Sequence, residues 1–319
     1  MSVHELTVPL SDQVPDFALA RLQHWALEKP LQIALRHRRH GTWKAWRWID
    51  VLREVERTAA ALSERGFGPG SRLALSGAFE PTLLLLALAA KRAGGQTLVV
   101  SRLARGEELR RQLLLARPGY AYVQRRENVS HWLLAGADSE LALQLFSAQS
   151  GERSAGAWKV LALDTLLGDR APDQHRLGWR HTWQEESVWN DEGTEWADGL
   201  SRILEHWLSS GLGFAFPETS ESAARDLRDI APSVLLLSAP RLQTLAAEIE
   251  SRLAPLGSWR RQLCDWTLLD ARYGVRRWIK ARVRHLLGFQ RVRSIVQGAP
   301  LPYAAPRPTW FRALLEKAA

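Results

Sequence analysis

Two histidines three residues apart, His37 and His40, are the first side chains in the sequence that could bind a metal ion. Imidazole is a common zinc ligand, but a zinc site takes four ligands, drawn from cysteine, histidine, carboxylate and water. The nearest neighbours of this pair are Arg36, Arg38 and Arg39, and no cysteine or carboxylate lies close by in the sequence. We therefore expect a solvated basic stretch rather than a metal site.

The sequence offers little else that would act as a nucleophile or a redox centre. Cys264 is the single cysteine, which excludes an intramolecular disulfide framework and a multi-cysteine zinc or iron–sulfur site. It lies beside Asp265 and Trp266 on a predicted helix, so we interpret it as a core thiol. No Gly-x-Ser-x-Gly nucleophile elbow occurs. The glycines of 66–70 precede a predicted strand rather than follow one, which indicates a turn and not a dinucleotide-binding loop.

Positive charge is concentrated in one segment near the end of the chain. The net charge is +9, and residues 271–293 contain eight basic residues and no acid, which leaves +1 for the rest. A nucleic-acid-binding protein usually spreads its basic residues more widely, so we expect no nucleic-acid partner. The segment could contact an anionic membrane or an acidic partner, or form a solvated face with no partner. The predicted basic surface consists of Arg272, Arg276, Arg277, Lys280, Arg282 and Arg284.

The elements that must position these groups alternate between helix and strand. Such alternation predicts an α/β fold, here as two βαβ-type subdomains, each with a parallel sheet covered by helices. Residues 15–62 have helical spacing on either side of a predicted hairpin at 41–48. The other predicted strands are 72–76, 97–100, 120–123, 158–163, 214–216 and 234–237. The other predicted helices are 81–90, 106–116, 130–146, 196–209, 240–253 and a helix through Ile230 that is capped by Ser220 or Ser222.

The polar stretch 168–194 interrupts this alternation, and we interpret it as a loop. The chain is therefore divided into a first α/β subdomain at 1–167, an irregular connection at 168–195 and a second subdomain at 196–319. Residues 1–13 lack the apolar segment of a secretory signal. The most apolar run, Leu83–Ala90, is far shorter than the ~20 residues that cross a bilayer. We expect a cytoplasmic protein, with peripheral membrane contact as an alternative.

Six blocks of sequence stand out beyond their predicted secondary structure: Thr42–Trp48, Gly66–Leu75, Gly211–Glu218, Asp226–Val234, Ala239–Arg241 and Val292–Leu301. In this order the blocks resemble bacterial long-chain fatty acyl-CoA synthetases, members of the AMP-forming, adenylate-forming superfamily. The resemblance covers most of residues 25–315 and implies the N-terminal domain fold of these enzymes. It also implies a remnant adenine loop at Gly298, Ala299 and Pro300, and acyl-site residues at Trp196, Trp207 and Phe214.

Two departures from this family bear on activity. The family has a Ser/Thr/Gly-rich loop ending in Pro-Lys-Gly, whose N–H groups and hydroxyls hold the ATP phosphates. The corresponding stretch here, 168–195, has no such loop and is several dozen residues shorter. The run Ser150–Lys159 imitates the loop, but it precedes a predicted strand and would turn Glu152 toward phosphate. The family's magnesium-binding motif and its C-terminal domain, with the catalytic lysine, would follow Ala319. We therefore expect a truncated chain in which that domain is absent.

These departures favour a degenerate, non-catalytic protein of the AMP-binding family that binds a fatty acyl group or a partner protein. On this interpretation we expect no cofactor and no metal. The alternative is an atypical long-chain fatty acid–CoA ligase, completed by another chain, which would use ATP, Mg²⁺ and CoA. A decayed gene product with no selected function is a third alternative.

Overall fold

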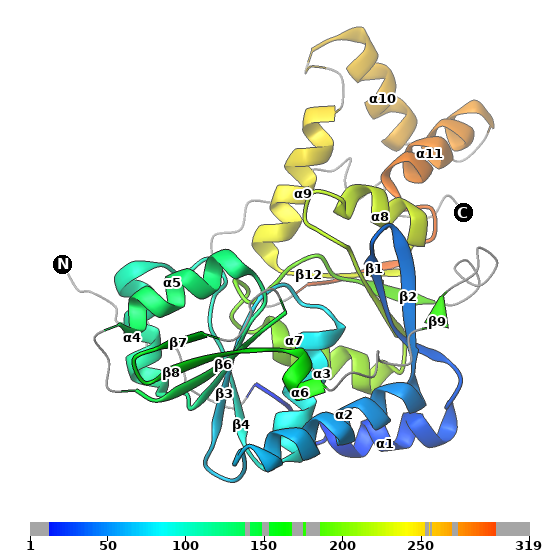
Figure 1. Cartoon of the computed structure of the whole chain (residues 1–319). Coiled ribbons are helices and arrows are strands. Elements are labelled where there is room, and N and C mark those ends of the chain that lie inside the picture. The colour runs from blue at the N-terminus through cyan, green and yellow to red at the C-terminus, as the bar shows by residue number, and fades with distance from the viewer. Residues whose placement is uncertain are drawn as a thin grey trace. The chain divides into compact units, whose positions relative to one another are not determined.

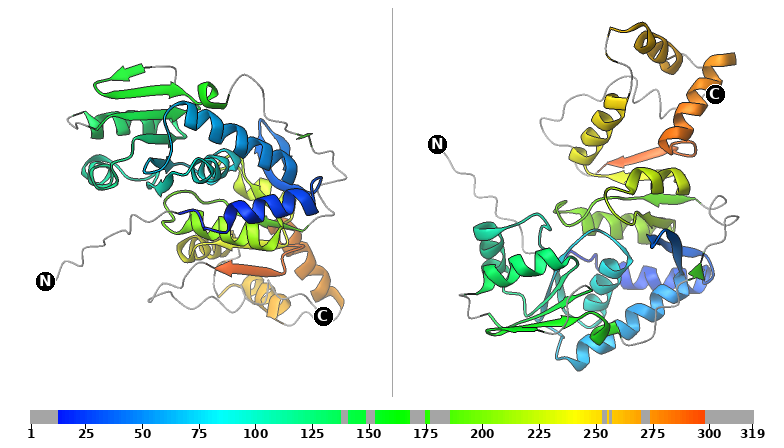
Figure 2. Two further views of the ribbon diagram at one scale, coloured as in Figure 1. Left: turned by 90° about the horizontal axis from the view of Figure 1, so that it is seen from below. Right: turned by 45° about the horizontal axis from the view of Figure 1, so that its top comes forward.

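The computed structural model describes residues 13–137, 141–148, 153–167, 175–176, 186–252, 255, 257–269 and 274–297. The chain forms two compact units that interleave in sequence (Figure 1, Figure 2). The first unit takes residues 1–32, 47–173 and 193–209, and the second takes 33–46, 174–192 and 210–319. Each unit is thus assembled from separate segments, whereas the boundaries proposed at 168 and 196 divide the chain in sequence order.

The first unit contains a six-stranded sheet in the order β4-β3-β5-β6-β8-β7. Neighbouring strands are parallel, except that β7 runs antiparallel to β8. The parallel pairing confirms the predicted α/β arrangement. Parallel neighbours need long crossover connections, which are usually helices. Its strands are β3 (Arg72–Ser76), β4 (Gln96–Val99), β5 (Tyr120–Val123), β6 (Leu143–Ser147), β7 (Arg153–Ala155) and β8 (Trp158–Ala162).

The helices of the first unit cover this sheet and pack against one another. Helices α4 and α5 contribute Leu109, Leu113 and Trp132 to a core shared with strand residues such as Val160. Helices α1, α2 and α3 form mutual contacts, and α3 begins with Pro81, whose fixed φ suits a first helical position. The bounds are α1 (Ala18–Glu28), α2 (Trp48–Glu64), α3 (Pro81–Arg92), α4 (Gly106–Ala116), α5 (Arg126–Gly136), α6 (Asp164–Leu167) and α7 (Gly199–Ser210).

The prediction of one helix over 130–146 is wrong. Helix α5 ends at Gly136, and residues 143–147 form β6, an interior strand of the sheet. Gly136 lets α5 lie close to the sheet, since a Cβ at this position would be 2.1 Å from Cζ2 of Trp158. Short apolar runs fit a buried strand as well as a buried helix, so periodicity does not locate this change of structure.

The second unit contains a seven-stranded sheet in the order β13-β12-β10-β11-β1-β2-β9. Strands β13, β12, β10, β11 and β1 are parallel, and β9 is antiparallel to β2. The predicted hairpin is present: His40 and Gly41, both with positive φ, form the two-residue turn between β1 and β2. The strands are β1 (Ile33–Arg39), β2 (Thr42–Arg47), β9 (His175–Arg176), β10 (Ser187–Trp189), β11 (Gly213–Phe216), β12 (Val234–Leu237) and β13 (Ser294–Gln297).

Helices α8, α9 and α11 enclose an apolar core on this sheet. Leu227 of α8 and Leu245 of α9 pack with Leu235 of β12 and with Phe289, which follows α11. The helices are α8 (Ala223–Ile230), α9 (Ala239–Arg252), α10 (Trp259–Leu269) and α11 (Gly274–Leu287). Among the described residues, no helix is long and apolar enough to cross a membrane.

Two further expectations are wrong for a shared physical reason. The loop predicted over 168–194 contains β10, whose three residues are fully buried between β11 and β12. Of the stretch predicted to be solvated at 36–40, residues 36–39 belong to β1, where Arg36 and His37 are buried, and only Arg39 and His40 are exposed. In both cases the sequence is polar or short, and only pairing with neighbouring strands makes the segment part of the core.

Candidate ligand-binding site

The order of strands in the second sheet creates a switch point between β10 and β12. From β10 the chain continues to β11 on one side, and then crosses to β12 on the other side. In open α/β sheets, ligands bind outside the carboxyl ends of strands at such a point. A ligand site is therefore expected at the residues that follow β10 and β12.

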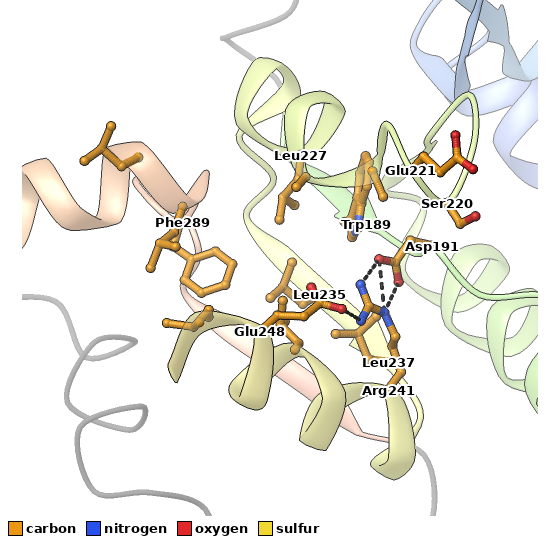
Figure 3. Close-up of a pocket in the computed structure, with 16 residues that line it drawn as sticks. Trp189, Asp191, Ser220, Glu221, Leu227, Leu235, Leu237, Arg241, Glu248 and Phe289 are labelled. Carbon is orange, nitrogen blue, oxygen red and sulfur yellow. Dashed lines mark hydrogen bonds and ion pairs between the residues drawn. The ribbon is translucent and has the colours of Figure 1, made fainter. Parts of the chain in front are cut away.

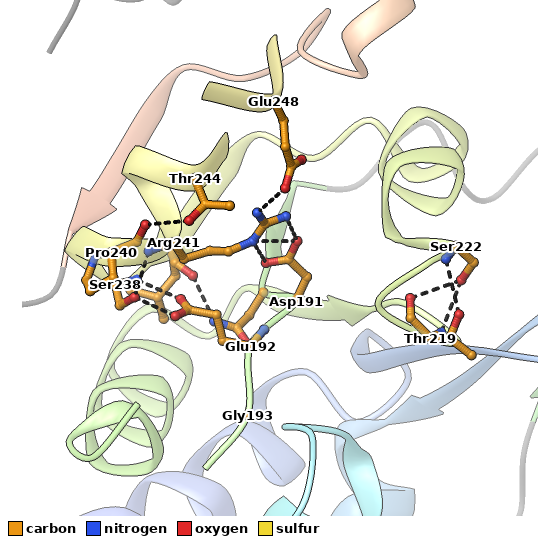
Figure 4. Close-up of polar contacts among 12 residues, drawn as sticks. Asp191, Glu192, Gly193, Thr219, Ser222, Ser238, Pro240, Arg241, Thr244 and Glu248 are labelled. Atoms are coloured by element: carbon orange, nitrogen blue, oxygen red, sulfur yellow. Dashed lines mark hydrogen bonds and ion pairs between the residues drawn. The ribbon is translucent and has the colours of Figure 1, made fainter. Parts of the chain in front are cut away.

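Polar residues gather at this position (Figure 4). Asn190 donates from Nδ2 to the carbonyl oxygen of Leu236 at 2.9 Å, and accepts at Oδ1 from the backbone N–H of Glu192 at 3.1 Å. The Glu192 carboxylate in turn accepts from the N–H of Ser238 at 2.6 Å and from its hydroxyl. The Ser238 hydroxyl oxygen accepts from the N–H of Arg241, which caps α9. These hydrogen bonds connect the carboxyl ends of β10 and β12.

Arg241 carries the positive charge of this cluster. Its Nη2 lies 2.6 Å from Oδ2 of Asp191, its Nε also donates to that carboxylate, and its Nη1 lies 2.8 Å from Oε1 of Glu248. Burial disfavours the charged guanidinium, but the hydrogen bonds and charges of Asp191 and Glu248 outweigh this effect and raise the pKa of Arg241. The bidentate pairing with Asp191 fixes the guanidinium plane. Arg241 thus forms ion pairs with two carboxylates, those of Asp191 and Glu248.

Next to this cluster lies a cavity of about 230 Å³ (Figure 3). Figure 3 shows Phe289 at one end and Ser220, Glu221 and Asp191 at the other. The apolar wall comes from β10, β12, α8, α9 and α11, and the polar edge comes from the residues after β10 and β11 and from α9. The apolar lining includes Trp189, Leu227, Leu235, Leu237, Leu245 and Phe289.

The size and charge of the cavity limit what it can hold. An engineered protein cavity of about 150 Å³ binds benzene, so by proportion this one holds roughly nine carbon atoms. Its polar edge carries the carboxylates of Asp191, Glu221 and Glu248 against the single guanidinium of Arg241. The formal charge there is negative, and it disfavours an anionic group on a ligand.

The residues implied as an acyl site are not brought together in this cavity. Trp207 is fully buried and stacks on Trp48 with ring centroids 5.2 Å apart, which makes it a packing residue of the first unit. Trp196 is half-buried and meets Phe79 edge to face. Phe214 is fully buried in β11 of the second unit. None of the three lines the cavity beside β12.

The other predicted site residues divide into described and undescribed positions. Gly298, Ala299 and Pro300 lie outside the described residues, as does Arg272, and the side chain of Arg276 is not described. Arg277 and Arg282 of the predicted basic surface are exposed. Lys280 and Arg284 are instead buried, and Arg284 donates to the carbonyl oxygen of Val292 at 2.8 Å. Within the described part of the chain, no group of three His, Cys, Asp or Glu residues is placed to hold a metal ion.

Sequence reasoning did not find the cluster around Arg241. Asp191 and Glu192 fall in the stretch interpreted as a loop, so their position after a buried strand was not visible. A usable signal was present at Ser238, which follows a correctly predicted strand and is followed by Ala-Pro-Arg. A serine at that place is a typical helix N-cap, and helix starts after parallel strands are common ligand sites.

Comparisons with known proteins agree with this architecture. Residues 22–173 match the family described as AMP-binding enzyme. No curated protein matches the chain. A similar solved structure is the A domain of a carboxylic acid reductase from Segniliparus rugosus, in complex with AMP and a co-purified carboxylic acid (TM-score 0.65, 15% identity, covering 97% of this chain and 62% of that chain). Another is the adenylation domain of the carboxylate reductase from Mycobacterium chelonae (TM-score 0.63, 16% identity, 93% and 55%).

Acetoacetyl-CoA synthetase from Streptomyces lividans is also similar (TM-score 0.59, 15% identity, covering 93% of this chain and 48% of that chain). The chain thus spans between 48% and 62% of the length of these three structures. At these identities the likeness concerns the fold alone. The protein therefore has the mixed α/β fold of the N-terminal domain of adenylate-forming enzymes, and its residues 22–173, just under half of the chain, match the AMP-binding enzyme family.

Proposed function

We propose that this protein binds a short or medium acyl group in the cavity beside β12 and does not adenylate carboxylic acids by itself. The observation that carries the proposal is the cavity itself: an apolar wall from five elements, closed at one edge by the Asp191–Arg241–Glu248 cluster. A volume of about 230 Å³ supports a chain of roughly nine carbons rather than the long chain implied by the resemblance.

The charge at the polar edge defines which form of the acyl group fits. A free carboxylate would meet a negative formal charge, and each unfavourable charge at about 4 Å costs at least ~1 kcal/mol even in bulk water. An esterified or amidated acyl group has no such cost. We therefore propose that the ligand is an acyl group whose carbonyl end is neutral, as in an ester, a thioester or an amide.

The residues at the switch point give no support to ATP binding. Phosphoryl chemistry depends on donors and cations that hold the phosphate oxygens. Here Asp191 and Glu192 follow β10, and the nearby cation, Arg241, is already held by two carboxylates. Residues 168–186 contain no lysine, no serine and a single threonine, Thr182. This composition is the reason to propose that the chain alone forms no acyl adenylate.

Two measurements test the proposal. The first is thermal stabilisation of the protein by octanoic acid, methyl octanoate and octylamine, which share a chain and differ in head-group charge. Methyl octanoate should bind at least about fivefold more tightly than octanoate, from ~1 kcal/mol of avoided repulsion. Equal or tighter binding of octanoate would refute the charge argument.

A matched pair of variants tests the location. Ala224 lines the cavity from α8, so Ala224→Leu should reduce binding of methyl octanoate, while Ala60→Leu at an exposed position of α2 should leave it unchanged. The second measurement is release of pyrophosphate from ATP in the presence of octanoate or a long-chain fatty acid. We expect none above the rate without protein. Robust release would overturn the proposal and favour the atypical ligase that uses ATP, Mg²⁺ and CoA.

A further inference from the structure

Helices α10 and α11 expose large apolar side chains, among them three tryptophans. Trp259 and Trp278 are each 69% exposed and Trp266 is 51% exposed. Among the residues that the structure describes, these are the tryptophans on the surface; the others are buried or half-buried. Leu263 and Leu286, on the same two helices, are also exposed. An indole costs free energy when it is left in water, so three of them in one region indicate a surface that is covered in use.

Helix α10 has its apolar face toward solvent. Trp259, Leu263 and Trp266 have the spacing of a single helix face, and all three are exposed. Arg261 is buried instead, at 4% exposure, with its guanidinium 2.6 Å from Glu250 and 2.9 Å from Asp265. A surface helix normally buries its apolar stripe and exposes its charges. In α10 the fold places the apolar stripe outward.

The exposed charge on the two helices is positive. Arg260, Arg277 and Arg282 are exposed, and Arg260 lies over the ring of Trp259 at 5.5 Å from its centroid. The single acid in the two helices is Asp265, which is already paired with Arg261. Indoles with interspersed guanidinium groups are the composition that suits the headgroup region of a bilayer. The charge is complementary to anionic lipid and repels a second copy of the same surface.

We propose that the exposed side chains of α10 and α11, here named the α10–α11 surface, dock the protein on an anionic membrane. The indoles and leucines enter the headgroup region, and the guanidinium groups bind lipid phosphate and carboxylate. The surface consists of Trp259, Arg260, Leu263, Trp266, Arg277, Trp278, Arg282 and Leu286. Helices α10 and α11 contact one another, so their exposed side chains belong to one region of the second unit (Figure 1).

Leu286 joins this surface to the cavity. It is 52% exposed and also lines the cavity. A docked protein would therefore hold one wall of its cavity at the bilayer, where apolar acyl groups are concentrated. This last consequence rests on the proposed function, whereas membrane docking depends on α10 and α11 alone.

Sedimentation with lipid vesicles tests the docking. The protein should bind vesicles of equimolar phosphatidylcholine and phosphatidylserine and should not bind vesicles of phosphatidylcholine alone. Each guanidinium near an anionic surface contributes about a fivefold gain in partitioning, so Arg277→Gln with Arg282→Gln should weaken binding by about 25-fold. Salt at about 1 M, where the Debye length is ~3 Å, should weaken it similarly. Trp259→Ser with Trp278→Ser should weaken binding in a salt-independent manner.

A matched control separates this surface from charge and apolarity in general. Arg125 and Leu134 are exposed on or beside α5, and Arg125→Gln with Leu134→Ser removes the same kinds of group elsewhere. This control should bind vesicles like the unchanged protein. Equal binding to both vesicle types, or binding that survives the Arg277/Arg282 change, would overturn the proposal. A dimer in lipid-free solution that the Trp259/Trp278 change dissociates would also overturn it, in favour of a second copy. The substituted residues do not line the cavity, so a failure of docking is distinguishable from a failure of acyl binding.

Discussion

His37 should make the stability of the second unit depend on pH, and the proposed test is its replacement by glutamine. His37 lies in β1 and is buried. Burial is the main cause that lowers its pKa, and the nearby charges of Arg39 and Lys44 lower it further. A hydrogen bond involving the backbone of Pro217 and the charge of Asp226 act in the opposite direction but do not compensate. The imidazole is therefore neutral in the folded protein at physiological pH.

The magnitude follows from the two pKa values. The pKa falls from 6.5, the ordinary value, to about 3 in the folded protein. Between these values the unfolded chain binds a proton that the folded chain does not, so the free energy of unfolding decreases as the pH falls. Lowering the pH from about 7 to about 5 should remove about 2 kcal/mol, since each titrated pKa unit is worth ~1.4 kcal/mol. The full contribution is present above pH 6.5 and is lost progressively toward pH 3.

Urea denaturation of the wild type and of His37→Gln, followed by circular dichroism, measures this contribution. All other ionisable groups are the same in both proteins, so their effects cancel in the difference between the two free energies of unfolding. The advantage of the wild type over the variant should shrink by about 2 kcal/mol between about pH 7 and about pH 5. A difference that stays constant over this range would refute the reasoning. It would mean that the pKa of His37 in the folded protein is close to its value in the unfolded chain. Nuclear magnetic resonance of the imidazole protons gives an independent check, because the His37 resonance should not titrate above about pH 4.5.

Three substitutions test the packing and the ion pair. Gly136→Ala should lower the free energy of unfolding by about 1–3 kcal/mol, since the new Cβ would overlap Trp158. Its control is Gly119→Ala, which should leave the free energy of unfolding unchanged because no atom lies within 4 Å of the new Cβ. Equal melting temperatures for the two variants would contradict this packing. Trp207→Ala should cost about 3–5 kcal/mol by thermal or urea denaturation; a stable variant that loses only acyl binding would instead support the role implied by the resemblance. Asp191→Asn should cost about 1–3 kcal/mol, because the guanidinium beside it loses a charged partner, and a negligible change in urea denaturation would show that the pair does not stabilise the fold.

Much of the fold could be predicted because its signals are local. The strands at 72–76, 120–123 and 234–237 are short apolar runs between turn residues, and the structure confirms their bounds. The helix at 106–116 is confirmed for the same reason, since its apolar spacing and flanking residues lie within the segment itself. The order of these elements was sufficient to predict a parallel α/β fold.

The sequence could not predict which polar segments become interior. Residues 187–189 look like part of a loop, and His37 looks solvated, yet both lie in central strands of the second sheet. Their burial is produced by hydrogen bonds to strands far away in the chain, as when Val188 pairs with Phe214 on one side and with Val234 on the other. Such pairing depends on the whole sheet, and no local pattern contains it.

The same division holds for the candidate site. The sequence by itself determined the family resemblance, the prediction that no phosphate loop lies between 168 and 195, and the basic segment at 271–293. Only the tertiary structure decided that Asp191 meets Arg241, fifty residues later, at the carboxyl ends of two neighbouring strands. It also decided that Lys280 and Arg284 are buried while Trp259, Trp266 and Trp278 are exposed. Composition fixes which charges and apolar groups a segment contains, but burial depends on how the elements pack, and packing determines which of those groups can reach a ligand or a membrane.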